Sequence, residues 1–132
     1  MASIHYLKRA AGEAVVKIYE TSSSGNTIEL DIANLISDGQ TFDANTANVT
    51  IKEIFWGVKH NHFIDISRKE RGGSGVHGHY YLVNAGSYDY DGFVDDVYSE
   101  RNIQVVFDGP GHVILKLNKT GGYSWQFSWT LI

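Results

Sequence analysis

The chain has 132 residues, of which 42% are hydrophobic and 13% aromatic, so it carries enough apolar side chain for the core of one domain. Its formal net charge of −4 disfavours nucleic acid as a partner, and no segment approaches the roughly 20 apolar residues that cross a membrane. The absence of cysteine excludes disulfides, thiolate nucleophiles and sulfur-rich zinc sites. We therefore expect a single domain over residues 1–132 that binds neither nucleic acid nor membrane.

Fourteen glycines against one proline, with many Thr, Val, Ile and Tyr, predict short strands joined by tight turns. Residues 1–12 precede the first clear strand pattern and are expected to form an extended N-terminal arm that docks on a neighbour. The predicted strands, in chain order, are residues 13–20, 27–35, 49–58, 62–67, 79–85, 101–107, 112–118 and 123–131. Strict alternation of apolar and polar residues, clearest in the second and last of these, predicts one buried and one exposed face.

Turn residues predict three hairpins, which join the first two strands, the third to the fourth, and the sixth to the seventh. The last is the strongest, because Asp108-Gly109-Pro110-Gly111 separates two apolar runs. Residues 37–48 are expected as a long surface loop, and residues 86–99 are ambiguous between a loop and a strand edge. The predicted fold is all-β: an antiparallel, jelly-roll-like β-sandwich of about eight strands. One or two helical turns at residues 31–37 or in the first twelve residues remain an alternative.

Histidines form two pairs spaced i, i+2, His60 with His62 and His77 with His79, and such pairs point to the same side of a strand. The segment His77-Gly78-His79 resembles the HxH motif of the cupins, which are jelly-roll metal-binding proteins. Residues 110–112 with Asn118 faintly resemble the later cupin motif. The glutamate that this resemblance requires is missing, because residues 82–84 are Leu, Val and Asn. A cupin-like metal-binding protein is therefore an alternative, and no cofactor is expected.

Acidic residues cluster between Asp89 and Glu100, with oxygen ligands at alternate positions as calcium requires. Phe93 occupies the fifth position of that spacing and has no oxygen to offer, so a solvated acidic loop is expected instead of a calcium site. No nucleophile elbow, phosphate loop or carboxylate pair stands out, and no catalytic residue is predicted. The chain is not expected to be an enzyme.

The last predicted strand has one aromatic face, made by Tyr123, Trp125, Phe127 and Trp129. Such a face is either part of the core or a platform on which sugars stack, and the polar residues between favour the core. A carbohydrate-binding or adhesin-type module of a tail or fibre is therefore a second alternative.

The small cysteine-free all-β chain, its Gly- and Asn-rich loops, its tyrosines and residues 112–119 together resemble head decoration (cement) or tail proteins of tailed bacteriophages. This resemblance implies a jelly-roll-like homo-oligomer, commonly a trimer, that binds the major capsid protein or another virion protein. It also implies localisation in the virion after synthesis in the host cytoplasm. The residues expected at such interfaces are Ile4, Tyr6, Leu7, Phe42, Asn45, Tyr88, Tyr90, Phe93 and Tyr98.

Overall fold

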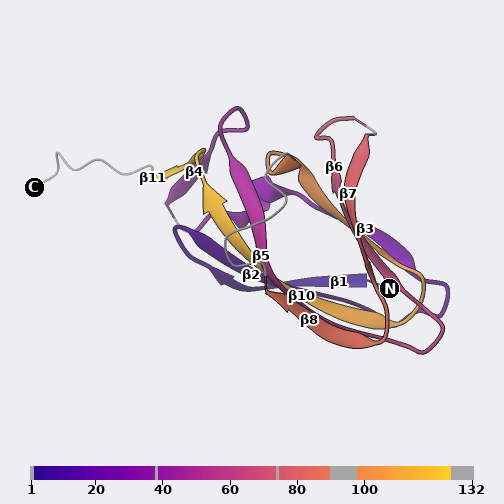
Figure 1. Ribbon diagram of the computed structural model, residues 1–132. Coiled ribbons are helices and arrows are strands. Elements are labelled where there is room, and N and C mark those ends of the chain that lie inside the picture. The colour runs from indigo at the N-terminus through magenta and orange to yellow at the C-terminus, as the bar shows by residue number, and fades with distance from the viewer. Residues whose placement is uncertain (1, 38, 74, 90–97, 126–132) are drawn as a thin grey trace, which may run out of the picture.

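The computed structural model folds the chain into two facing antiparallel β-sheets and describes residues 2–37, 39–73, 75–89 and 98–125 (Figure 1). The strands are β1 (Ala2–Arg9), β2 (Glu13–Glu20), β3 (Asn26–Leu30), β4 (Gln40–Phe42), β5 (Asn48–Val58), β6 (Ile64–Lys69), β7 (Val76–Leu82), β8 (Ala85–Asp89), β9 (Asn102–Phe107), β10 (Gly111–Thr120) and β11 (Tyr123–Trp125). Between β3 and β4 lies one 3-10 helix, η1 (Ile32–Leu35). The prediction of an antiparallel all-β sandwich is confirmed.

The larger sheet has the strand order β1-β2-β10-β5-β8, and the facing sheet has the order β3-β9-β6-β7. The short strands β4 and β11 pair with each other in a separate ribbon. The described residues contain eleven strands instead of about eight. The sequence did not indicate β1 or β4, and β8 overlaps the segment 86–99 that the sequence leaves ambiguous between a loop and a strand edge. No helix in the described ranges has both the length and the apolar character needed to cross a membrane.

Side chains that alternate along the strands fill the space between the sheets. In β10, Val113, Leu115 and Leu117 are fully buried, whereas the residues between them are partly exposed. Strands β2 and β9 follow the same rule, with buried side chains at every second position. Burying an aliphatic side chain of this size contributes about 1.5–3 kcal/mol. The core is therefore a double layer made by the inward faces of both sheets, as the sequence pattern predicts.

All three predicted hairpins are wrong, because each turn carries the chain from one sheet to the other. Strands β2, β5 and β10 lie in the larger sheet, whereas β3, β6 and β9 lie in the facing one. The turn at 108–110 bonds to a neighbouring loop instead of across itself: Asp108 N donates to Phe63 O at 3.0 Å, and Lys59 N donates to Pro110 O at 3.0 Å. Glycine-rich turns fit both a hairpin within one sheet and a connection between two sheets. The connection between sheets places the apolar faces of the two sheets against each other.

The predicted N-terminal arm is wrong for residues 2–9. These residues form β1, which pairs antiparallel with β2 along its whole length, from Ala2 opposite Glu20 to Arg9 opposite Ala14. The segment has partners in its own chain because its apolar side chains Ile4 and Tyr6 lie opposite Ile18 and Val16 and pack against the core. It is an outer strand of the larger sheet and not a free arm.

The segment between β3 and β5 is more ordered than the surface loop predicted for residues 37–48. A short 3-10 helix lies within residues 31–37, where one or two helical turns were the alternative, and the side chain of Asp31 accepts from Ala33 N at 2.9 Å. Strand β4 follows and pairs with β11, more than 80 residues later in the chain. Three residues are too few for an alternation pattern, so this strand has no local signal.

Candidate interaction surfaces

The outer edge of β1 carries the first three predicted interface residues. Ile4 and Tyr6 turn toward the core, and burial raises the pKa of Tyr6, an effect that the guanidinium of Arg9 at 4.8 Å from the ring opposes. Leu7 is 57% exposed and lies at a β-bulge, where the pairing with β2 shifts register between Tyr6 and Lys8. A bulge re-aims a side chain, so only Leu7 of the three is presented to solvent as an apolar contact.

Beside this edge runs a groove of about 880 Å³, lined by residues 6–11 of β1 and its turn and by residues 36, 37, 39 and 40 after η1. Its rim is polar: Lys8 Nζ forms an ion pair with Glu13 at 2.9 Å, and Arg9 Nη1 donates to Asn34 O at 3.5 Å. β1 has a neighbour on one side only, so the described residues leave its other edge open. Open strand edges are templates for pairing with a second chain.

A buried lysine supports the floor of the groove. Lys119 Nζ donates to Leu35 O at 2.6 Å and to Gln40 Oε1 at 2.9 Å. Burial, and to a smaller extent the nearby charge of Arg9, lowers the pKa of Lys119 to about 8. Gln40 Nε2 in turn donates to Ala11 O at 3.1 Å. Lys119 follows the buried positions 113, 115 and 117 at the same spacing, and this is the signal that could have placed it inward, although the predicted strand ends at residue 118.

Phe42 and Asn45 belong to the region around the β4–β11 ribbon and not to the β1 edge. Phe42 packs edge-to-face on Tyr123 with ring centroids 5.4 Å apart, and the guanidinium of Arg71 lies 4.9 Å from its centroid. Asn45 is exposed in the following turn, where its backbone N donates to Asp43 Oδ1 at 3.0 Å. The ring of Phe42 is used within the chain, which leaves Asn45 as the accessible member of this pair.

Of the remaining predicted interface residues, Tyr98 is described in full, and it lies beside the start of β7. Tyr98 stacks on His77 with ring centroids 4.9 Å apart, and Arg101 lies 4.9 Å above the ring of Tyr98. Tyr98 also offers its backbone O to Nε of the fully buried Arg68 at 3.1 Å. The side chain of Tyr88, and Tyr90 and Phe93 entirely, lie outside the described residues. The described members of the predicted set therefore do not form one patch, since β1 and β8 are opposite edges of one sheet.

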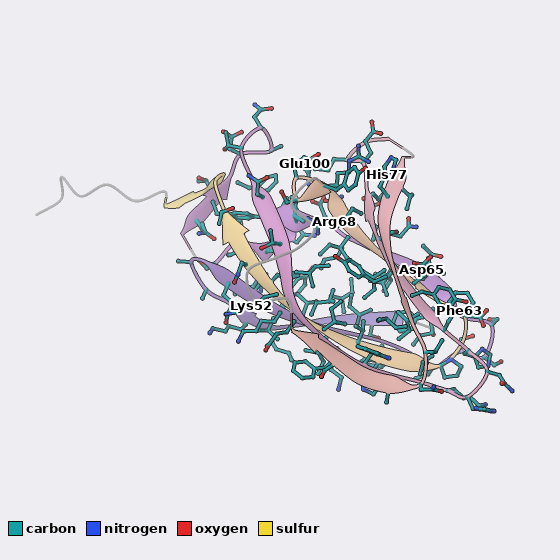
Figure 2. All side chains as sticks on the ribbon, viewed as in Figure 1. Lys52, Phe63, Asp65, Arg68, His77 and Glu100 are labelled. Carbon is teal, nitrogen blue, oxygen red and sulfur yellow. The ribbon has the colours of Figure 1, made fainter. Side chains whose placement is uncertain are left out.

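Two of the histidines that resemble cupin ligands lie at opposite ends of the sandwich. His77 pairs with Arg68 near the 70–75 turn, whereas His112 pairs with Gly57 at the start of β10. Figure 2 shows His77 and Arg68 well away from Phe63, which marks the other end. The side chain of His79 lies outside the described residues, among which no group of three or more His, Asp or Glu side chains gathers as a metal site requires.

The predicted acidic loop falls largely outside the described residues, which include Asp89 by its backbone and Glu100 in full. Glu100 is exposed, and its carboxylate lies 3.7 Å from Nε of Arg101. In the aromatic terminal strand, Tyr123 packs against the core and its hydroxyl donates to Ile32 O at 2.7 Å. The described part of the chain does not include the side chain of Trp125 or any part of Phe127 and Trp129. The core interpretation therefore holds for Tyr123.

Four loops meet at one end of the sandwich, which we call the loop end: residues 21–25, 59–63, 83–84 and 108–110. The strand register brings them together, because Gly111 lies opposite both Glu20 and Val58. The depression between the second and third of these loops has a volume of about 280 Å³. Its wall is an aromatic pair, Phe63 stacked on Tyr81 at 4.7 Å and 22°, and Tyr81 is 62% exposed.

Polar groups surround this aromatic pair. Asn61 and Asn84, with φ of 69° and 60°, are the non-glycine residues with positive φ in the described part of the chain, and both line the depression. His62 Nδ1 lies 3.2 Å from Asp108 Oδ2. The sequence did not indicate this site, because Phe63 and Tyr81 lie 18 residues apart and meet only through the register of β6 and β7.

Comparison of the chain with protein-family models, with curated proteins and with solved structures finds no match. Function is therefore inferred from the arrangement of the chain's own residues.

Proposed function

We propose that the chain is a structural protein of a virus particle, a decoration or cement protein that stabilises the head of a tailed bacteriophage. The observation that carries the proposal is the strand order, in which β2-β10-β5-β8 face β3-β9-β6-β7. This order of eight strands supports a jelly roll, because the chain changes sheet at every connection between them except β6–β7. Strand β1 extends the first of these sheets at its edge.

Jelly rolls of this kind serve mainly as viral structural domains, as lectin domains and as cupins. The separation of His77 from His112 removes the support that their sequence motifs lend to the cupin class. Carbohydrate binding, as in lectins, would take place at the loop end, and a protein located in the virus particle can also bind carbohydrate. A structural role needs only an accessible surface that other subunits bury, which the edge of β1 offers.

The contact surface in this proposal is the open edge of β1 with Leu7 and the adjoining groove. A strand of eight residues offers backbone N–H and C=O groups to a strand of another chain, and Leu7 supplies an apolar side chain to bury. The partner at this edge is the major capsid protein or another virion protein, and the chain itself forms a homo-oligomer such as a trimer. Repetition over the particle turns modest contacts into large stabilisation.

The test begins with mass spectrometry of purified particles of the phage whose genome encodes the chain. We expect the chain at a copy number comparable to that of the capsid protein, and its absence from the particles would refute the proposal. The purified chain is then added to particles that lack it. Wild type should bind and raise their thermal stability.

Leu7→Glu is the diagnostic variant, because a carboxylate at the bulge opposes burial. It should weaken binding to the particles by at least about tenfold, or 1.4 kcal/mol. Phe55→Glu is the matched control, since Phe55 is 45% exposed on the outer face of the larger sheet, away from the β1 edge. Equal losses for both variants would exclude the β1 edge as the contact, whatever the location of the protein.

A further inference from the structure

The loop end presents an exposed aromatic ring that is held from behind by a second ring. Phe63 covers one face of Tyr81 at 4.7 Å, and 62% of Tyr81 remains exposed. Val83, next to it, is 48% exposed. Exposure of the apolar face of a fixed ring to water is unfavourable in free energy, and exposed apolar surfaces of this kind mark binding sites.

The side chains around this ring are short and polar, and together they carry both hydrogen-bond donors and acceptors. Asp65 lies directly across from Tyr81 in the strand register, which puts the two side chains on the same outer face. Figure 2 shows Phe63 and Asp65 together on the outside of the smaller sheet. Asn61 and Asn84 line the depression beside the ring, each held in the left-handed backbone region. Strained or sparsely populated backbone conformations concentrate at binding sites.

We infer that the depression at residues 60–63 and 81–84 binds one pyranose ring of a carbohydrate, with Tyr81 as the stacking platform. The polarised C–H groups on one face of a pyranose pack against the negative face of an aromatic ring. A carboxylate accepts from the hydroxyls around its edge, whereas amide and imidazole groups can both accept from and donate to them. Asp65, Asn61 and Asn84 supply such groups beside the platform.

The size and charge of the site select among ligands. A volume of about 280 Å³ lies just below the range of about 300–1,000 Å³ that holds a drug-sized molecule, so it suits a single ring or a chain end. Asp65 and Asp108, in a chain of net charge −4, disfavour a nucleotide or another phosphate-bearing ligand. A neutral polyol with an apolar face fits both conditions.

The experiment is a titration of the ¹⁵N-labelled full chain with the methyl pyranosides of glucose, galactose, mannose and N-acetylglucosamine. Each is taken to about 50 mM, because a single ring typically binds near the millimolar level, about −4 kcal/mol. We expect at least one sugar to produce saturable amide shifts confined to residues 60–63 and 81–84. The pyranose ring could belong to a bacterial polysaccharide or to an animal-type glycan. Binding to an array that carries both classes of carbohydrate then distinguishes these two sources.

Variants test whether the ring of Tyr81 carries the binding. Tyr81→Ala should weaken it at least tenfold, whereas Tyr81→Phe, which keeps the stacking face, should stay within about threefold of wild type. Phe55→Ala removes an exposed ring from the other sheet and should leave binding unchanged. Thermal unfolding of each variant shows that the fold is intact.

Three results would overturn the inference: no saturable shift with any of the four sugars, shifts located elsewhere, or undiminished binding by Tyr81→Ala. The site is independent of the β1 edge, so loss of particle binding in Leu7→Glu does not bear on it.

Discussion

At the loop end Tyr81 is open to solvent, whereas at the opposite end of the sandwich Tyr123 packs against the core and its hydroxyl donates to Ile32 O. The opposite end also buries Lys119 and Arg68, whose charged groups donate to backbone oxygens. One end thus uses aromatic and charged side chains to hold the chain together, and the other leaves them available. Replacing these buried side chains at the opposite end should therefore cost stability, and replacing Tyr81 at the loop end should cost binding.

The largest loss of stability is expected for Gly121→Ala. Gly121 has φ of 69°, and a Cβ there would overlap the backbone oxygen of Thr46. The free energy of unfolding should fall by more than about 3 kcal/mol, because both strain and a backbone clash must be relieved. Chemical denaturation measures this loss.

Gly72→Ala is the matched control for that substitution. Its φ is 72°, but a Cβ there meets nothing within 4 Å, so only the left-handed conformation contributes, about 1–2 kcal/mol. Similar losses for the two variants would mean that the turn at Gly121 is not tightly packed against Thr46.

Asn102→Ala should cost about 2–4 kcal/mol. The buried amide accepts from Ile32 N at 3.0 Å and from Arg71 Nη1 at 3.1 Å, and it donates to Glu29 Oε2 at 2.6 Å, so its loss leaves a buried backbone donor unsatisfied. The exposed Asn45→Ala is the control and should change the free energy of unfolding by less than about 0.5 kcal/mol. A loss below about 1 kcal/mol for Asn102→Ala would show that the opposite end does not depend on this network.

Lys119 should give the protein a distinctive pH dependence. Its folded-state pKa of about 8 lies below the ordinary value of 10.5, so between these values the unfolded chain binds more protons than the folded chain. The free energy of unfolding therefore rises with pH in that window, by about 1–2 kcal/mol between pH 7.5 and 9.5.

Lys119→Met isolates this effect, because every other titrating group is unchanged. Urea denaturation of both proteins at the two pH values gives the comparison. The variant should lack the increase that wild type shows, and identical slopes in the two proteins would contradict a buried, charged lysine beneath the groove.

The smallest expected effect on stability comes from removing a tyrosine hydroxyl, and it compares Tyr123 with Tyr81 directly. Tyr123→Phe removes the hydroxyl that donates to Ile32 O and should lower the free energy of unfolding by about 1 kcal/mol. Tyr81→Phe should change it by less than about 0.5 kcal/mol, because the ring is exposed. If Tyr81→Phe lowers the free energy of unfolding more than Tyr123→Phe does, the hydroxyl of Tyr81 has a structural role that its exposure does not suggest.

The proposed sites differ in how far the sequence could indicate them. Apolar residues before the first clear strand drew attention to Ile4, Tyr6 and Leu7, although only Leu7 is strongly exposed, because pairing with β2 turns the other two inward. The aromatic pair at the loop end has no local signal, since Phe63 and Tyr81 meet through strand register. The resemblance to phage decoration proteins and the chain's place in a particle stay predictions until the particles are examined.

The sequence by itself determined where most strands lie and which of their faces is buried, because side chains alternate across a strand and apolar ones leave water. This holds for Val113, Leu115 and Leu117, whereas Lys119, at the next inward position, lies beyond the predicted strand, which ends at residue 118. Only the tertiary structure decided which strands pair. A turn such as 108–110 permits either a hairpin or a crossing, and the choice depends on hydrogen-bond partners and apolar faces that lie far away in the chain.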